Sequence, residues 1–464
     1  MNLHSNTIAA VATPRGNGGI AVIRISGPSA FEIGGRIFTP KSKKYGSFAD
    51  IPPNTAVFGG ISQIDEGLAL KFLAPHSYTG ENTVEISCHG GSYIANAVLA
   101  AAIAAGARPA EAGEFTKTAY LNGKISLTGA EAVGRLIMAK NERGAKLALA
   151  QAKGGLSKKI GAIAEKIKDM ISEVYVEIDY PGEQLADIAP EAMLLALGEI
   201  KSELDALKES YNIGRIISEG ISCAIVGKPN SGKSTLLNAL SGEEVAIVHQ
   251  TPGTTRDVVA SRVNLGEFVI NFYDTAGLRE SGDEIERLGI EKTHEKIAAC
   301  ELILGVFEAN NFDELDRATL EILKREQKNG KKIVPILNKC DLPDCEGVGA
   351  DFGAPPLLIS AKANFAVSGL SVAGALAKYL EDIYRPGDYG LEEGEVLTEE
   401  RQYLEILAAC ENLESAIASL KLGFSQDVAG LSLELAARSL GRCDSRQVSE
   451  DIVEKIFKNF CVGK

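Results

Sequence analysis

Residues 227–234 read Gly-Lys-Pro-Asn-Ser-Gly-Lys-Ser. They follow a short apolar run, 221–226, and precede a stretch of helical character, 235–240. A strand, a glycine-rich loop and a helix in this order form a P-loop, in which backbone N–H groups surround phosphate oxygens. Lys233 is expected to reach the β- and γ-phosphates, and the Ser234 hydroxyl to bind Mg²⁺. The sequence therefore predicts a nucleoside triphosphate site in an α/β domain.

Further segments follow in the order of a GTP-binding domain. Residues 253–257, Gly-Thr-Thr-Arg-Asp, could close a switch threonine over Mg²⁺ and the γ-phosphate. Residues 274–277, Asp-Thr-Ala-Gly, come after the strand-like run 268–273, which would place a carboxylate at a strand end near the metal. Residues 338–341, Asn-Lys-Cys-Asp, follow the second buried-strand pattern, 332–337. The spacing favours GTP over other nucleotides.

The Asn-Lys-Cys-Asp segment carries the prediction of guanine specificity. Its Asp341 can accept two hydrogen bonds from N1 and N2 of guanine, which adenine cannot supply, and sites built on such contacts reject analogues that lack them. Residues 360–362, Ser-Ala-Lys, would close the base pocket. The predicted GTP-binding residues are Asn230, Ser231, Gly232, Lys233, Ser234, Thr235, His249, Gln250, Thr251, Pro252, Gly253, Thr254, Thr255, Asp274, Thr275, Ala276, Gly277, Asn338, Lys339, Asp341, Ser360, Ala361 and Lys362.

Length and charge limit the remaining possibilities. A chain of 464 residues should form about two to four domains. A formal net charge of −14 argues against a surface that is basic all over, as in a protein that wraps nucleic acid. Residues 138–170 nevertheless carry eight Lys or Arg against three acidic residues. This basic segment is either a solvated helix face or a contact to an RNA backbone.

Cysteine spacing and hydropathy indicate a cytoplasmic protein. The eight cysteines form no CxxC pair and have no histidine cluster nearby, so neither a zinc site nor a disulfide framework is expected. The longest apolar run, Ala95 to Ala107, is too short to span a bilayer and is expected to form a buried helix. No basic region precedes the mildly apolar stretch 8–12, so no signal peptide is expected.

The spacing of apolar residues divides the chain into four segments. Residues 1–119 contain strand-like runs, 120–215 have helical periodicity, 216–383 hold the nucleotide motifs, and 384–464 are helical again. The expected strands of the first segment are 21–25, 68–72 and 83–87, and the expected apolar face of the last is Leu404, Leu407, Cys410, Leu413, Ile417 and Leu420, then Ile452, Ile456 and Phe460. Helices on both sides of a self-contained α/β domain indicate an insertion into one helical bundle.

The catalytic residues of this domain must differ from those of many GTPases. Leu278 stands after Asp-Thr-Ala-Gly, where a glutamine often orients the attacking water, and leucine cannot do so. The nearest carboxylates are Glu280, Asp283, Glu284 and Glu286. Arg256 and Arg279 could stabilise charge or form surface ion pairs. Asn230 could help to coordinate a K⁺ that replaces an arginine finger, or could be ordinary loop chemistry.

Taken together, the segments resemble the MnmE (TrmE) family of tRNA-modification GTPases over essentially the whole chain. The G-domain segments that carry the resemblance are 227–234, Thr-Pro-Gly-Thr-Thr-Arg-Asp (251–257), Asp-Thr-Ala-Gly-Leu-Arg (274–279) and Glu-Arg-Leu-Gly-Ile (286–290). Outside that domain they are Gly-Glu-Phe-Thr (113–116), Leu-Asn-Gly-Lys (121–124) and the terminal Phe-Cys-Val-Gly-Lys (460–464). The last three are specific, because other GTPases have no reason to carry them.

The resemblance implies a fold of mixed α/β and all-α domains. It implies an α/β folate-binding and dimerisation domain over 1–119, a helical bundle built from 120–215 and 384–464, and a Ras-like P-loop G domain over 216–383 inserted into that bundle. The G domains would pair across a homodimer in a K⁺-dependent way. The implied residues are Lys233, Thr255, Arg256 and Glu286 for catalysis, Ser234 and Thr255 for Mg²⁺, Asn230, His249, Thr251 and Thr254 for K⁺, and Arg24, Glu85, Lys124 and Lys464 for folate.

One segment departs from the family pattern. His249 and Gln250 open the switch loop where Thr-Asp or a similar pair is expected. Backbone carbonyls at these positions could still bind the cation. The folate residues fit their ligand chemically, because Arg24 or Lys124 could pair with its carboxylates and Glu85 could accept hydrogen bonds from the pterin.

The activity implied by the resemblance is that of a K⁺-activated GTP hydrolase, an acid-anhydride hydrolase. With a FAD-dependent partner (MnmG, also called GidA) in a hetero-oligomer, such an enzyme adds an aminomethyl or carboxymethylaminomethyl group at C5 of the wobble uridine, position 34, of certain tRNAs. The implied cofactors are GTP as substrate, Mg²⁺, K⁺ and 5-formyl- or methylene-tetrahydrofolate, with FAD on the partner. No membrane association is expected.

Two other function classes and the role of Cys461 stay open at this stage. A ribosome-assembly GTPase related to Era would use GTP only to switch its affinity for RNA, but would need neither a folate pocket nor the terminal Cys-Val-Gly-Lys. A membrane-remodelling GTPase is disfavoured by the missing membrane segment. Cys461 could have a redox or covalent role or be a buried structural thiol. The segment 461–464 fits a prenylation signal poorly, because Gly463 is not aliphatic.

Overall fold

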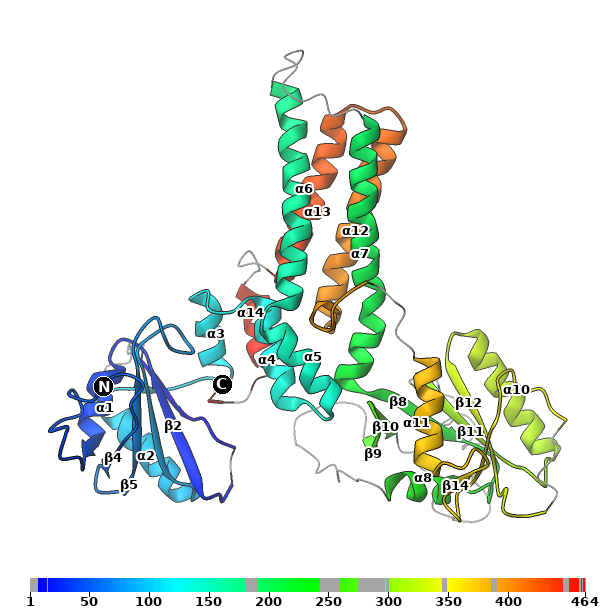
Figure 1. Ribbon diagram of the computed structural model, residues 1–464, viewed down its shortest axis with the longest axis horizontal. Helices are drawn as coiled ribbons and strands as arrows, with labels where there is room; N and C mark the ends of the chain where they lie inside the picture. Colours follow the sequence, from blue (N-terminus) through cyan, green and yellow to red (C-terminus); the bar gives the residue numbers. More distant parts are fainter. Residues whose placement is uncertain are drawn as a thin grey trace.

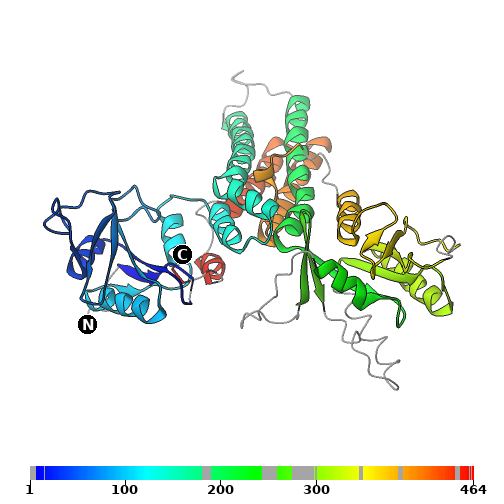
Figure 2. The same ribbon diagram turned by 60° about the horizontal axis from the view of Figure 1, so that its bottom comes forward.

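The computed structural model describes residues 7–14, 16–179, 190–242, 259–273, 297, 300–343, 349–384, 390–444, 450–458, 460 and 462–463. These residues form three bodies: an N-terminal sheet domain, a helical stalk, and an α/β domain with the P-loop (Figure 1). Figure 2 shows the first and third bodies on opposite sides of the helical body. Within the described ranges, no helix is both long and apolar enough to cross a membrane.

The N-terminal body is one mixed sheet with α1 and α2 over one face and Phe115 of α3 packed on the other. Its strands are β1 (Ile8–Val11), β2 (Ile20–Ser26), β3 (Phe38–Pro40), β4 (Val57–Ile61), β5 (Asp65–Phe72), β6 (Thr83–His89) and β7 (Arg108–Pro109), in the order β3-β4-β5-β6-β2-β1-β7. Its helices are α1 (Ala30–Ile37), α2 (Ser92–Ala104) and α3 (Glu114–Leu121). The three strands expected from the sequence are thus present, each slightly longer than predicted. The apolar run from Ala95 lies largely in α2, of which only Ala95, Val98 and Ala102 are buried.

Side chains alternate between the two faces of the sheet along the central strands β2 and β6. Ile23 and Ile25 of β2 pair with Ile86 and Val84 of β6 and enter the core beneath the helices. Arg24 therefore points to the opposite face, together with its cross-strand partner Glu85. The Arg24–Glu85 pair therefore lies on the face opposite the core of α1 and α2.

Helices from both ends of the chain build the stalk. They are α4 (Leu127–Met138), α5 (Glu142–Ala152), α6 (Gly155–Asp179) and α7 (Pro190–Glu219) before the G domain, and α12 (Glu400–Lys421), α13 (Gln426–Asp444) and α14 (Glu450–Lys458) after it, with a short turn η1 (Glu393–Glu395). One core joins α6, α7, α12 and α13. The helical domain is therefore a single bundle into which the P-loop domain is inserted.

The expected apolar face of the last segment differs in detail from the structure. Leu404 is exposed, and Ile406 and Ala409 take the buried positions of α12 instead. Helix α14 buries Val453 and Phe457, while Phe460 lies beyond its end. The difference arises because α12 packs against both α7 and α13, so its buried stripe is set by two neighbours rather than by its largest side chains.

The inserted domain is a seven-stranded sheet with helices on both sides. Its elements are β8 (Ile221–Val226), α8 (Lys233–Ser241), β9 (Val259–Leu265), β10 (Phe268–Tyr273), β11 (Leu302–Glu308), α10 (Glu314–Lys328), β12 (Lys332–Asn338), β13 (Leu357–Ser360), β14 (Phe365–Ala366) and α11 (Val372–Ile383). The strand order is β14-β13-β12-β11-β8-β10-β9, with parallel pairing from β13 to β10. The carboxyl ends of β8, β11 and β12 therefore meet at one edge, where open α/β sheets bind ligands.

Candidate guanine-nucleotide site

The P-loop joins β8 to α8 and is held so closely that two of its residues must be glycine. A Cβ on Gly227 would lie 2.2 Å from the Val306 carbonyl oxygen, and one on Gly232 would lie 2.1 Å from Nδ2 of Asn338. Gly232 also has φ of +95°, a conformation that favours glycine. The loop backbone is therefore pressed against β11 and β12.

We expect Gly232→Ala to raise the dissociation constant for GTP at least about 10-fold, because the backbone strain and the clash with Asn338 must displace the loop. Gly242→Ala is the matched control, since that residue has an ordinary φ of −72° at the end of α8 and meets nothing closer than 3.5 Å. Binding of a fluorescent GTP analogue measures both variants. Equal affinities for the two would show that the tight loop is not needed.

The ammonium group of Lys233 is held against the backbone of the phosphate loop. Its Nζ donates to the carbonyl oxygens of Gly227 at 2.8 Å and Lys228 at 2.6 Å. Burial lowers the pKa of this ammonium group. A desolvated cation whose partners among the described residues are carbonyl oxygens would gain strongly from an anion, and a triphosphate would supply one.

Asn338 links three of the predicted segments rather than pointing into an open base pocket. Its Nδ2 donates to the Ser231 carbonyl at 2.9 Å, and its Oδ1 accepts from the Ala361 backbone N–H at 2.9 Å. The side chain is buried. The phosphate loop and the loop expected to hold the base are therefore fixed relative to each other.

Asp341 lies exposed at the same edge, as a base-recognising carboxylate should. A hydrogen bond from the Ser360 hydroxyl, with smaller effects of Lys362 and Lys339, lowers the pKa of its carboxyl group. Lys339 has a positive φ of 67° and forms an ion pair with Glu308 at the end of β11. The carboxylate is thus kept ionised and able to accept two hydrogen bonds from guanine.

The remaining predicted nucleotide residues divide into two groups. Ser234 and Thr235 are exposed in the first turn of α8, and Asn230, with φ of 62°, is exposed in the loop. The predicted residues that lie outside the described part of the chain are His249, Gln250, Thr251, Pro252, Gly253, Thr254, Thr255, Arg256, Asp274, Thr275, Ala276, Gly277 and Glu286. Among the described residues, no three His, Cys, Asp or Glu side chains gather as a metal site. The described candidate for Mg²⁺ is therefore the hydroxyl of Ser234.

Sequence reasoning missed two charged residues that support these loops. Lys228 is buried behind the P-loop, and Glu308 pairs with Lys339 behind the base-recognition segment. Nothing in the spacing of the motifs indicates where either side chain points. Only the fold shows that Lys228 pairs with carboxylates at the start of α10 and that Glu308 pairs with Lys339.

The residues predicted for folate gather in part on the face of the N-terminal sheet opposite α1 and α2. Arg24 Nε donates to Glu85 Oε1 at 2.8 Å, and its guanidinium carbon lies 5.7 Å from the ring centre of Tyr78 and 5.6 Å from that of Phe115. Lys124 Nζ donates to the Pro75 carbonyl at 2.9 Å, in the loop that also carries Tyr78. Arg24, Glu85 and two aromatic rings therefore form one cluster, with Lys124 at the neighbouring loop.

The C-terminal tail returns from the stalk to this N-terminal body. Val462 forms a bridge with Ala112, and a Cβ on Gly463 would lie 2.3 Å from the Val11 carbonyl oxygen. Helix α14 packs against α3 (Figure 1). The predicted Cys461 and Lys464 lie outside the described residues, but the residues between them contact the N-terminal body.

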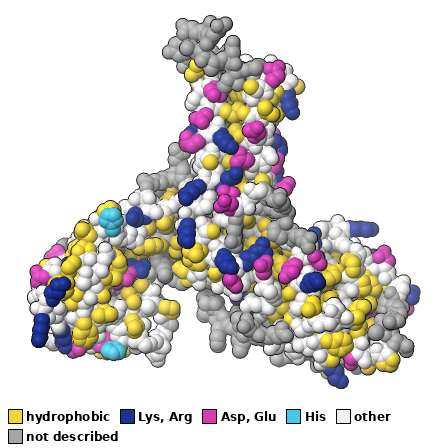
Figure 3. All heavy atoms as spheres, in the orientation of Figure 1, with side chains coloured by type: hydrophobic (Ala, Val, Ile, Leu, Met, Phe, Trp, Pro, Cys, Tyr) yellow, Lys and Arg dark blue, Asp and Glu magenta, His cyan; other side chains and the backbone are white. Residues whose placement is uncertain are grey.

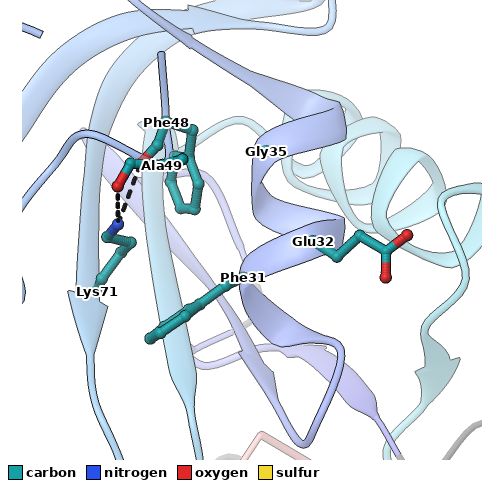
Figure 4. A pocket seen from close by; sticks show the side chains of 6 residues that line it. All are labelled: Phe31, Glu32, Gly35, Phe48, Ala49 and Lys71. Atoms are coloured by element: carbon teal, nitrogen blue, oxygen red, sulfur yellow. Dashed lines mark hydrogen bonds between the residues drawn. The ribbon is translucent and has the colours of Figure 1, made fainter.

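A separate hollow of about 410 Å³ lies on the helix-covered side of the same sheet (Figure 4). Lys71 closes it by donating to the carbonyl oxygens of Phe48 and Ala49, both at 3.1 Å, between the rings of Phe31 and Phe48. Lys71 of β5 pairs with Val84, so its side chain lies on the core face of the sheet and not on the face of Arg24. The hollow is therefore distinct from the cluster around Glu85.

The basic segment 138–170 is largely neutralised within the molecule. Five of its eight cations form ion pairs: Arg143, Lys146, Lys159, Lys166 and Lys168. Figure 3 shows Lys and Arg side chains interspersed with acidic ones along the stalk, not gathered into one patch. An RNA contact through this segment stays a prediction.

Comparison with known proteins accounts for nearly the whole chain. The family model described as the N-terminus of the GTP-binding protein TrmE matches residues 7–124, and the model of the MnmE helical domain matches residues 127–461. The chain belongs to the MnmE family. The MnmE helical match encloses the inserted P-loop domain, in agreement with the observed order of elements.

Curated MnmE relatives match over their full length. The tRNA modification GTPase MnmE of Acetivibrio thermocellus is 37% identical over 99% of both chains. Those of Carboxydothermus hydrogenoformans and Thermotoga maritima are each 38% identical over 99% of this chain and 99% and 100% of their own. Among solved structures, the G domain of the T. maritima FeoB iron transporter matches 37% of this chain at 22% identity with a TM-score of 0.23, too low to bear on the fold.

Proposed function

We propose that this member of the MnmE family is a K⁺-activated GTPase that modifies the wobble uridine of certain tRNAs together with a FAD-dependent partner of the MnmG (GidA) kind. The observation that carries the proposal is the match over 99% of the chain to relatives named tRNA modification GTPase MnmE. The proposed product is an aminomethyl or carboxymethylaminomethyl group at C5 of uridine 34, with a tetrahydrofolate supplying the carbon.

Hydrolysis would begin with GTP held at the edge of the G-domain sheet. Asp341 would accept the guanine hydrogen bonds, and the loop N–H groups and Lys233 would surround the phosphates. Ser234 and Thr255 would hold Mg²⁺, which supplies positive charge to the β- and γ-phosphate oxygens. The position of the Lys233 ammonium group supports this role. It donates to two carbonyl oxygens of the loop, and phosphate oxygens of GTP could replace them as acceptors.

Glu286 would orient the attacking water, as its match to the water-orienting glutamate of the family implies; Leu278 cannot take this role. Thr255 would close over the γ-phosphate, and Arg256 would stabilise the charge that develops on it. K⁺ would add positive charge near the same oxygens, held by Asn230, His249, Thr251 and Thr254. The exposure of Asn230 supports this assignment, because its side chain is available to a cation and to a second G domain.

The one-carbon chemistry is assigned to the N-terminal body. Arg24, Glu85, Lys124 and Lys464 would bind a 5-formyl- or methylene-tetrahydrofolate, and Cys461 lies three residues before Lys464 in the sequence. The Arg24–Glu85 pair supports the proposal, since a guanidinium and a carboxylate beside two aromatic rings suit a flat, polar pterin with an acidic tail. Exposed Ile20, Phe58 and Leu68 on the same sheet support a homodimer through this body.

We expect Arg24→Ala to weaken binding of 5-formyl-tetrahydrofolate by at least about 10-fold, because it removes a charged hydrogen-bonding group from the proposed site. Arg36→Ala is the matched control, since Arg36 forms an exposed ion pair with Glu32 on α1. Isothermal titration calorimetry measures both. An unchanged dissociation constant for the Arg24 variant, with the fold intact by circular dichroism, would exclude Arg24 from the site.

The function as a whole is tested by nucleoside mass spectrometry of bulk tRNA. Cells that lack the gene should lose the C5-aminomethyl type of wobble uridine. Wild-type protein should restore it, and Lys233→Ala should not. If the nucleoside profile is unchanged and ribosomal subunits accumulate, the protein is instead an assembly GTPase related to Era.

A further inference from the structure

Lys228, the second residue of the P-loop, points away from the phosphate side and into the protein. Its side chain is 7% exposed. The ammonium group makes three contacts, to the Asn311 carbonyl at 2.6 Å, to Asp313 Oδ2 at 2.9 Å and to Asp316 Oδ2 at 2.8 Å. A lysine has three N–H donors, so all of them are engaged. The side chain is therefore fixed in one position.

The acceptors of Lys228 belong to the start of α10, which is itself rigid. Asp313 and Asp316 form the capping box of that helix, in which each side chain accepts a hydrogen bond from the backbone N–H of the other. Phe312 packs against Phe307 and Phe352, with ring centres 5.7 and 5.9 Å away. This clamp of Lys228, Asp313 and Asp316 thus ties the loop to an element that cannot easily shift.

The clamp holds one end of the P-loop, and Asn338 holds the other. Asn338 fixes the Ser231 carbonyl on the side of β12. Between the two attachments lie Pro229 and Asn230, which are exposed. The carbonyl of Lys228 is also one of the two oxygens that hold the Lys233 ammonium. The position of the clamp therefore decides where Lys233 and the first half of the loop lie.

Charge shows that Lys228 does not act on phosphate directly. Burial alone would lower the pKa of its ammonium group, but hydrogen bonds with Asp316 and Asp313 outweigh burial and raise it. Asp316 is fully buried, and its Oδ1 has no hydrogen-bond partner among the described residues. Two carboxylates thus surround one ammonium group, which leaves no positive charge for a ligand.

We infer that Lys228, with Asp313 and Asp316, is a positioning residue that preorganises the phosphate loop for GTP. The inference rests on the proposed binding of GTP at this loop. Loss of the clamp should weaken GTP binding, because a displacement of about 1 Å in a binding or reacting group can cost up to about 10²-fold. It should have less effect on turnover at saturating GTP, because the side chain does not contact the transferred phosphate.

The experiment uses the full chain and a double variant, Lys228→Met with Asp316→Asn. The single change Lys228→Met would leave a buried carboxylate without its cation and destabilise the fold, whereas replacing both charges together is often neutral for stability. We expect the double variant to bind GTP about 10-fold more weakly, with KM rising similarly and kcat changing less than about 3-fold. Lys228→Arg should stay within about 3-fold of the parent affinity, because a guanidinium can still bond both carboxylates.

Lys324→Met is the matched control. Lys324 lies on α10, as Asp316 does, and its ammonium group is 3.9 Å from Glu321 and 3.7 Å from Asp351. It should bind GTP like the parent. A double variant that melts near the parent temperature and binds GTP with parental affinity would overturn the inference. So would a loss of affinity in Lys228→Arg as large as in the double variant. A parent that does not bind GTP at all would refute the proposed function itself.

Discussion

Lys233→Ala should lower kcat/KM for GTP hydrolysis by about 10³-fold, the effect of removing a preorganised charge from a developing anion. Among the described residues, the ammonium group of Lys233 donates to the carbonyl oxygens of Gly227 and Lys228 and to no carboxylate. Its removal therefore leaves no carboxylate of the described residues without its cation, and the fold should persist. Phosphate release under multiple-turnover conditions, with thermal unfolding measured in parallel, checks both expectations.

Lys332→Ala is the control for this change. Lys332 is an exposed lysine at the start of β12, in the same domain but at the opposite end of a strand from Asn338. Its loss should leave hydrolysis within about 2-fold of the parent, as for most surface substitutions. If Lys233→Ala had the parental kcat/KM, Lys233 would have no role in hydrolysis and the assignment of the phosphate site would be wrong.

Asp341→Asn should lower kcat/KM for GTP by about 10²-fold and raise the ratio of XTP to GTP hydrolysis by about 10³-fold. The carboxylate can accept from both N1–H and N2–H of guanine. An amide accepts one of these hydrogen bonds and donates to the C2 carbonyl that xanthine has in place of the amino group. The Asp341→Asn substitution should therefore change the preferred base from guanine to xanthine and leave the binding of the phosphates unchanged.

Competition between GTP and XTP in one hydrolysis assay measures this reversal. Asp351→Asn serves as control, because Asp351 is an exposed carboxylate that accepts a hydrogen bond from the Gly353 backbone and lies away from Asn338. Its base preference should equal that of the parent. If Asp341→Asn loses GTP activity without gaining XTP activity, Asp341 supports the loop rather than recognising the base.

Much of the nucleotide domain could be predicted from local sequence, because each motif combines a strand, a turn and a chemical group within a few residues. The insertion into a helical bundle was also predictable, since apolar periodicity stops before β8 and resumes at α12. The family resemblance, confirmed by the matches over 99% of the chain, adds the organisation of the N-terminal domain. Local pattern alone gives only three of its strands.

Contacts between residues far apart in the chain could not be predicted. Asp444 accepts hydrogen bonds from the Thr128 backbone and hydroxyl at 3.0 and 2.5 Å, across 316 positions. Arg401 similarly binds Glu131 through two nitrogens, at 2.9 and 3.0 Å. Polar partners of this kind have no periodicity, so a single sequence does not pair them. For the same reason the clamp on Lys228 became visible only in the fold.

The bridge between Val462 and Ala112 pairs residues that are synthesised far apart in time. At a synthesis rate of about 5–20 residues per second, the strand partner of Ala112 follows it after tens of seconds. The apolar faces of α6 and α7 cannot be buried until α12 and α13 have been synthesised, because the four helices share one core. The complete G domain is synthesised after α7 and before α12. A nascent chain can therefore hold a finished nucleotide domain before either of the other two bodies is complete. Truncation by only a few residues at the C-terminus would then damage the domain made first.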